Sequence, residues 1–243
     1  MVAPRPAVGG ALSVASRAIG AGIFAAVRRY IPLVALLGAA CATTQAARPV
    51  GRGNTRISAS LGGPLVQFGG APVPLPITTV GVAHGVSDFV DVHGEVHPTA
   101  ALFGIAGLSG GVALHPLSSH RGALTFGASL NAFGNPSDGV LFADLWVAGG
   151  GHAASWLWLG GGLHNGLRLA GTGSINEQTP WAPTVFGLAS FLVSRRVALN
   201  VEARWYAVAS CGGCVAPDYY PLGDRGALGV LLGVDYQFGG GAR

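Results

Sequence analysis

Four side chains that could do chemistry project from one face of a single predicted strand. Residues 90–97 alternate between apolar and polar types, and the polar set is Asp91, His93, Glu95 and His97. Two imidazoles and two carboxylates could bind a divalent metal or relay protons. Alternate side chains lie about 7 Å apart, because a strand rises about 3.3 Å per residue, so a metal would need ligands from a neighbouring strand. We favour an internal network in which these acids pair with Arg204 or Arg56, because an unpaired buried charge is costly.

Further charged residues lie on the polar faces of other alternating segments. They are Asp144, Glu202 and Arg204. We expect these side chains to face an interior, where they could line or fill a channel.

Residues 107–111 come nearest to the Gly-x-Ser-x-Gly signature of hydrolases but lack its strand–turn–helix context. The phosphate-loop signature GxxxxGK[ST] is excluded, because the chain contains no lysine. We therefore expect neither enzymatic activity nor a bound cofactor or metal.

The cysteines point to a disulfide more than to a metal site. Cys211 and Cys214 flank two glycines in a predicted long connection before the last strand. A zinc site is the alternative, but its four ligands would need a second pair, and Cys41 is the only other cysteine. In an exported protein the oxidising compartment favours the disulfide.

Beyond the N-terminal region the pattern is one strand after another. Sustained helical periodicity is lacking, whereas many windows alternate with period two. The clearest windows are residues 197–206 and 228–238, each with one apolar and one more polar face. The predicted strands lie at residues 55–62, 77–85, 89–97, 101–115, 122–133, 139–150, 154–167, 182–194, 197–209 and 226–238.

The predicted connections differ in length with a regular parity. Short links lie near Ser87-Asp88, Gly151-His152 and Arg195-Arg196, and longer ones span residues 63–76, 168–181 and 210–225. Long loops after odd strands and short turns after even strands are typical of an outer-membrane barrel with both termini in the periplasm. A wall of eight strands is the alternative, if the first region lies outside it.

Composition indicates which face of the strands points outward. The 243 residues are 50% apolar and only 10% charged, and all 14 basic residues are arginine. The surface of a soluble barrel would need many more charged residues, about 25–35%. The polar faces hold mostly Gly, Ser, Thr and Asn, which suits an interior. An apolar exterior in lipid requires that every backbone group be paired, and a closed antiparallel barrel meets that requirement.

The last strand carries a family resemblance. Val234-Asp235-Tyr236-Gln237-Phe238 resembles the closing strand of bacterial outer-membrane β-barrel proteins, whose assembly signal is an aromatic-rich strand that ends in Phe. The resemblance covers residues 53–238 as an architecture. It implies an all-β fold: a closed antiparallel up-and-down transmembrane β-barrel of about ten strands, inserted by the outer-membrane assembly machinery.

The N-terminal region has the layout of a secretory signal. Arg28-Arg29 precedes an apolar run over residues 30–37 and small residues at 38–40. Residues 36–41 resemble a lipobox, in which the cysteine, here Cys41, is lipidated and becomes the first residue. Cleavage at an Ala-x-Ala pattern is the alternative. We predict an N-terminal extension and signal peptide over residues 1–47, cleaved near Cys41 or shortly after, and a barrel over residues 48–243.

The charge distribution excludes one class of partner. The first 40 residues carry four arginines and no acidic residue, whereas ten Arg balance ten Asp and Glu from residue 41 onward. Because no basic patch is interleaved with aromatic residues, we expect no nucleic-acid binding.

The whole sequence predicts an exported outer-membrane β-barrel of structural, adhesive or narrow-pore type. Its expected partners are outer-membrane lipid and, without an identified substrate, a small solute. One alternative is an outer-membrane-embedded enzyme that acts on lipid or envelope glycan and uses His93 or His97 with a carboxylate. The other is a periplasmic β-protein tethered through a lipid on Cys41.

Overall fold

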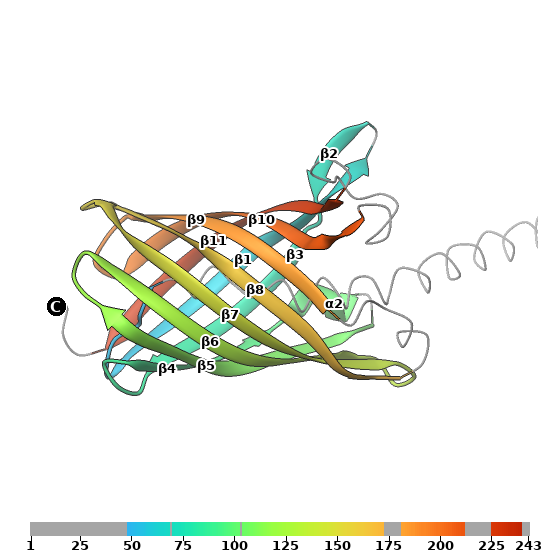
Figure 1. The fold of residues 1–243 in the computed structure, drawn as a ribbon, viewed down its shortest axis with the longest axis horizontal. Helices are drawn as coiled ribbons and strands as arrows, with labels where there is room; N and C mark the ends of the chain where they lie inside the picture. The colour runs from blue at the N-terminus through green and yellow to red at the C-terminus, as the bar shows by residue number, and fades with distance from the viewer. Residues whose placement is uncertain (1–47, 69, 103, 173–180, 212–224, 240–243) are drawn as a thin grey trace, which may run out of the picture.

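A computed structural model describes residues 48–68, 70–102, 104–172, 181–211 and 225–239, which form a wall of antiparallel strands (Figure 1). The strands are β1 (Asn54–Phe68), β2 (Ala71–Pro74), β3 (Ile77–Gly85), β4 (Val90–Val96), β5 (Ala106–Ser118), β6 (Gly122–Gly134), β7 (Gly139–Ala154), β8 (Leu157–Gly171), β9 (Trp181–Leu192), β10 (Val197–Cys211) and β11 (Arg225–Gly239). A short helix, α2 (Pro98–Leu102), lies between β4 and β5. No helix among these residues is long and apolar enough to cross a membrane.

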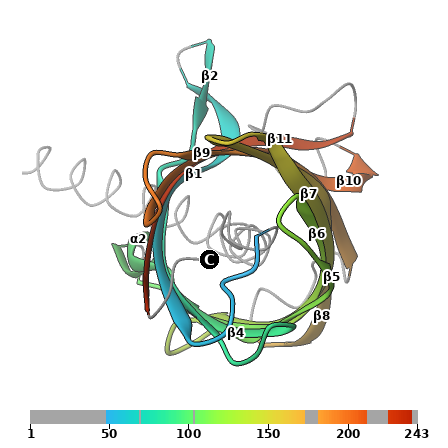
Figure 2. The same ribbon diagram turned by 90° about the vertical axis from the view of Figure 1, so that its left-hand side faces the viewer.

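Pairing between the last strand and the first closes the sheet into a ring (Figure 2). β11 pairs with β1 in a register that runs from Asn54 opposite Gly239 to Pro64 opposite Gly229. The short strand β2 pairs with the far end of β1 alone and projects from the ring. The wall therefore has ten strands, which confirms the predicted count and excludes the alternative of eight.

Three connections differ from the prediction. A loop is predicted over residues 63–76, but β1 continues to Phe68 and forms a hairpin with β2. A strand is predicted from residue 101, but Pro98 begins α2 and β5 starts at Ala106. Proline suits the first turn of a helix, where its missing N–H has no intrahelical partner. β7 also runs to Ala154, beyond the predicted turn at residues 151–152.

Successive side chains alternate between the outside and the inside of the ring, as the pattern predicts. On β11, Leu232 and Val234 point outward and are 56% and 43% exposed, whereas Leu231 and Asp235 point inward and are buried. Exposed apolar side chains on the other strands of the wall include Ile57, Val82, Val92, Leu114, Phe126, Leu145, Leu163, Val185 and Leu199. The outer surface of the wall is therefore apolar.

The two ends of the ring differ in their connections (Figure 1). At the end where β1 begins and β11 ends, successive strands are joined by links of two to four residues. The β1–β2 hairpin and α2 lie at the opposite end, where β8 is also joined to β9 and β10 to β11 by longer connections. This arrangement follows the predicted parity, except that the link between β6 and β7, residues 135–138, is short.

Candidate functional site

The inner face of the ring is the candidate site because it is lined by polar side chains. The inward rows contribute buried Ser, Thr, Asn, His and charged residues with exposed fractions of at most 6%, together with the half-buried His93 and Gln237. Large apolar side chains share this face, among them Phe142 and Trp146 on β7 and Phe186 on β9. A ring that is polar inside and apolar outside has the reverse polarity of a soluble barrel.

A row of polar residues crosses from β4 to β7 at one level of the interior. In the strand register, His93 lies opposite Gly111, Gly111 opposite Ser129, and Ser129 opposite Asp144. Nε2 of His93 reaches across β5 to Oγ of Ser129, at 3.0 Å. Gly111 permits this contact, because a Cβ at that position would lie 2.7 Å from the Ser129 hydroxyl.

Asp144 joins this row to a second histidine. Its Oδ2 atom lies 2.8 Å from Nδ1 of His164 on β8, and both side chains are at most 2% exposed. The rings of Trp146 and Phe186 lie 6.1 and 5.0 Å from the His164 ring. Within the described residues, Oδ1 of Asp144, Nε2 of His164 and Oγ1 of Thr184 have no hydrogen-bond partner. Thr184 lies opposite His164 in the register, so these three polar atoms come from neighbouring strands of the inner face.

The charged residues predicted on β10 are both inside the ring. Glu202 and Arg204 lie two residues apart on the same face, and their side chains are 0% exposed. Nε of Arg204 donates a hydrogen bond to Oε1 of Glu202. Nearby on this face, the Ser190 hydroxyl donates to Oδ1 of Asn200 at 2.6 Å. Arg204 thus has an acid of its own strand as a partner, and the predicted pairing of Arg204 with Asp91 or Glu95 stays a prediction.

His97 lies just beyond β4 and is held on both sides. Its Nδ1 is 3.3 Å from the Thr79 hydroxyl, and its Nε2 is 3.2 Å from the Ser109 hydroxyl. Its ring lies 5.0 Å from that of Phe133. Since both ring nitrogens bind the wall, His97 links β3 to β5 and is poorly placed for chemistry on a solute.

The predicted row on β4 is divided among different partners. Oδ2 of Asp91 accepts a hydrogen bond from the backbone N–H of Val50 at 2.8 Å and lies 2.8 Å from Nε2 of His115. Nδ1 of His115 in turn lies 2.8 Å from the Thr125 hydroxyl. Glu95 is buried farther along the strand. In the part of the chain that the structure describes, no group of three or more His, Cys, Asp or Glu could hold a metal ion.

Sequence reasoning does not identify His115 or His164 as interior residues, and it places Ser129 on the polar face of residues 124–133 without a partner. His115 follows the glycines at 107, 110 and 111, and His164 follows those at 160–162, so the period-two pattern is blurred before each. The signal that could have placed both histidines inside is their spacing along the strand. Each lies an even number of residues from a buried residue of its own strand, which is polar for His115 and is Trp158 for His164, and such residues share one face.

The cysteine predictions fall largely outside the described residues. Cys211 is the last residue of β10. Cys214 and Cys41 lie in segments that the structure does not describe. The disulfide and the lipid anchor therefore stay predictions.

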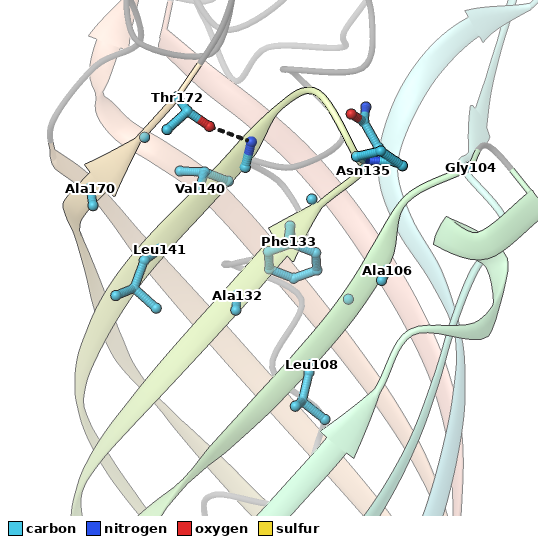
Figure 3. A pocket seen from close by; sticks show the side chains of 15 residues that line it. Gly104, Ala106, Leu108, Ala132, Phe133, Asn135, Val140, Leu141, Ala170 and Thr172 are labelled. Atoms are coloured by element: carbon cyan, nitrogen blue, oxygen red, sulfur yellow. Dashed lines mark hydrogen bonds between the residues drawn. The ribbon is translucent and has the colours of Figure 1, made fainter.

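A groove of about 760 Å³ lies on the outer surface of the ring (Figure 3). It is near the end of the ring that carries α2, away from the end where β1 begins. It spans β5 to β8, where Leu108, Ala132, Leu141 and Ala170 are paired in one outward row of alternating large and small side chains. At its edge, the Thr172 hydroxyl accepts a backbone hydrogen bond at 3.0 Å. Because this groove is apolar and faces away from the interior, it belongs to the outer surface and not to the candidate site.

The strand arrangement is similar to that of solved porins and outer-membrane proteins. The KdgM porin is 10% identical, with 76% of this chain and 99% of that chain covered and a TM-score of 0.39. The NanC porin is 9% identical, with 75% and 98% covered and a TM-score of 0.43. The outer-membrane protein OprG from Pseudomonas aeruginosa is 12% identical, with 79% and 100% covered and a TM-score of 0.30. No family model and no curated protein matches the sequence.

Proposed function

We propose that this chain is an integral outer-membrane β-barrel whose interior is a narrow polar path for small solutes. The observation that carries the proposal is the reversed polarity of the closed ring. Leu130, Leu163 and Leu232 are each more than half exposed on the outside, whereas Asp144 and Glu202 are at most 1% exposed inside. In lipid, this arrangement pairs the backbone of every strand and needs no polar outer surface. In water, it would expose a large continuous apolar belt.

The same belt weighs against a periplasmic β-protein tethered through Cys41, because a soluble wall would turn its polar residues outward. Export through a signal peptide, contact with outer-membrane lipid and insertion by the assembly machinery belong to the proposal, and a lipid on Cys41 would be an additional anchor.

The alternative of a membrane-embedded enzyme has less support than the solute path. His97 is bound by Thr79 and Ser109, and the partner of His93 is the hydroxyl of Ser129.

The interior charges give the proposed path a preference for cations. The charged inward side chains of the described strands and of the segment before β1 are Asp91, Glu95, Asp144, Glu202, Asp235, Arg48, Arg56, Arg168 and Arg204, with Arg168 assigned by its register position opposite the buried Phe142. Five carboxylates against four guanidinium groups leave a net charge of −1, with histidines counted as neutral. A narrow passage with low-dielectric walls and a net negative charge concentrates cations.

Planar-bilayer recording of the folded protein tests this proposal. We expect discrete conductance steps and, in a salt gradient, a reversal potential that indicates cation preference. Asp144→Asn removes one interior charge but keeps an acceptor for His164, and it should shift the reversal potential toward zero. Asp88→Asn removes the same charge from an exposed link and is the matched control. A wild type without conductance, or equal shifts in the two variants, would refute the proposal.

A further inference from the structure

The chain segment that precedes β1 lies inside the ring at the end where β1 begins. Residues 48–53, called the latch below, curve inward from the first strand (Figure 2). The side chain of Val50 is only 3% exposed. A segment that did not pack against the barrel would leave such a side chain in solvent. The latch is therefore part of the packed interior.

Both backbone polar groups of Val50 are bound by inward side chains. Its N–H donates to Oδ2 of Asp91 on β4 at 2.8 Å, and its carbonyl accepts from Nε2 of Gln237 on β11 at 3.0 Å. His115 holds the same Asp91 oxygen at 2.8 Å. Because β1 and β3 lie between β11 and β4, these two bonds fix Val50 across four neighbouring strands.

Arg48 adds a charged attachment. Its Nη2 lies 3.8 Å from Oδ2 of Asp235, and its carbonyl accepts a hydrogen bond from Nη1 of Arg56 at 3.0 Å. Burial and the charge of Arg56 lower the pKa of Arg48 to about 10, and Asp235 opposes them. Arg48 therefore stays protonated at neutral pH and attracts Asp235.

Gly85, the last residue of β3, leaves the space that the latch occupies. The Gly85 carbonyl accepts a hydrogen bond from the Gly53 N–H at 2.8 Å. The backbones of Arg52 and Gly85 also form an isolated parallel β-bridge. A Cβ at Gly85 would overlap the carbonyl group of Gly51. Gly85 does not have the positive φ that disfavours other residues. Alanine at this position would therefore fit the strand and displace the latch.

We propose that the latch narrows the mouth of the interior path at the end where β1 begins, and that releasing the latch widens the path. The inference rests on the proposed function of the barrel as a path. A barrel of about eight strands has an interior just wide enough for its own side chains. In a wall of ten strands, the interior is only moderately wider, and the latch occupies part of that additional space.

Thiol labelling of the folded barrel tests the position of the latch. Val50→Cys is labelled with a water-soluble maleimide, and labelling of the parent chain is subtracted to remove the native cysteines. We expect slow labelling of this variant and severalfold faster labelling when Gly85→Ala is added. Gly187→Ala is the matched control, because a Cβ there meets nothing within 4 Å, and it should leave the labelling rate unchanged.

Bilayer conductance of the same variants tests the narrowing. We expect larger conductance steps for Gly85→Ala than for the wild type or Gly187→Ala. Gln237→Ala, which removes one latch hydrogen bond without a clash, should change both readouts in the same direction. Unchanged labelling, or faster labelling with unchanged conductance, would overturn the latch proposal alone. A lack of conductance in the wild type would refute the path itself, and the role of the latch with it.

Discussion

Trp146 shows how one residue shapes the inner wall. Its indole covers Gly127 on the neighbouring strand, where a Cβ would overlap the ring. The same side chain is 6% exposed and packs in a buried cluster with Ala113, Phe186 and Leu188. The cluster supports the His164 ring, so an apolar layer positions the polar row beside it.

Gly127→Ala should therefore destabilise the barrel. The added methyl group must displace the Trp146 ring from a packed site, which costs about 1–3 kcal/mol. Urea unfolding in lipid vesicles, followed by tryptophan fluorescence, measures the change. Gly149→Ala is the matched control on β7, since a Cβ there would have its nearest contact at 3.8 Å. Equal unfolding midpoints for the two variants would contradict the packing described for Trp146.

Individual contacts were harder to predict than the direction of individual side chains. Local alternation suffices to assign Asp144 and Glu202 to the polar face. The contact between His93 and Ser129 depends on the relative register of three strands, and glycine-rich strands specify register weakly. The hydrogen bond from the latch to Asp91 could not be foreseen either, because it comes from a segment with no periodic pattern.

The strands themselves were predictable where apolar and polar residues alternate without interruption. The predicted segments 197–209 and 226–238 agree with β10 and β11 to within two residues at each end. The region around residues 98–105 was mispredicted, because Pro98 begins a helix where alternation continues on both sides. The β1–β2 hairpin was missed for a similar reason: the prolines at 64, 72 and 74 are typical of loops, although edge strands also tolerate them.

A charge on the outer face of β10 should be costly at the middle of the strand. Val201 is 40% exposed and lies opposite Leu232 on β11 and Ala189 on β9. If this face contacts lipid, Val201→Lys should lower the free energy of unfolding by about 2–4 kcal/mol, whereas a site near the interface loses about 0–1 kcal/mol. Val193→Lys, in the link before β10, is the control near the interface.

Reversible unfolding in vesicles measures both variants. A small loss for Val201→Lys, equal to that for Val193→Lys, would show that the face of β10 is solvated. That result would contradict the assignment of the outer face to lipid.

The composition of the whole chain indicated which face of the barrel points outward. Soluble proteins place apolar side chains inside and polar ones outside, and a membrane barrel does the reverse. A sequence with no lysine and only 10% charged residues cannot cover a soluble barrel, yet it can line a narrow interior. Composition does not specify the solute. The interior combines acids, arginines, histidines and aromatic rings, and its net charge predicts the sign of a favoured ion but not its identity.

The most direct test of the central claim is the gel mobility of the outer-membrane fraction with and without boiling, for the wild type and for Cys41→Ser. A closed barrel in the membrane should stay folded in detergent at room temperature and unfold on boiling. We therefore predict a heat-dependent mobility shift that survives the substitution, with both proteins in the membrane fraction. The absence of a shift, together with release of Cys41→Ser into the soluble fraction, would contradict the integral barrel and favour a tethered periplasmic β-protein.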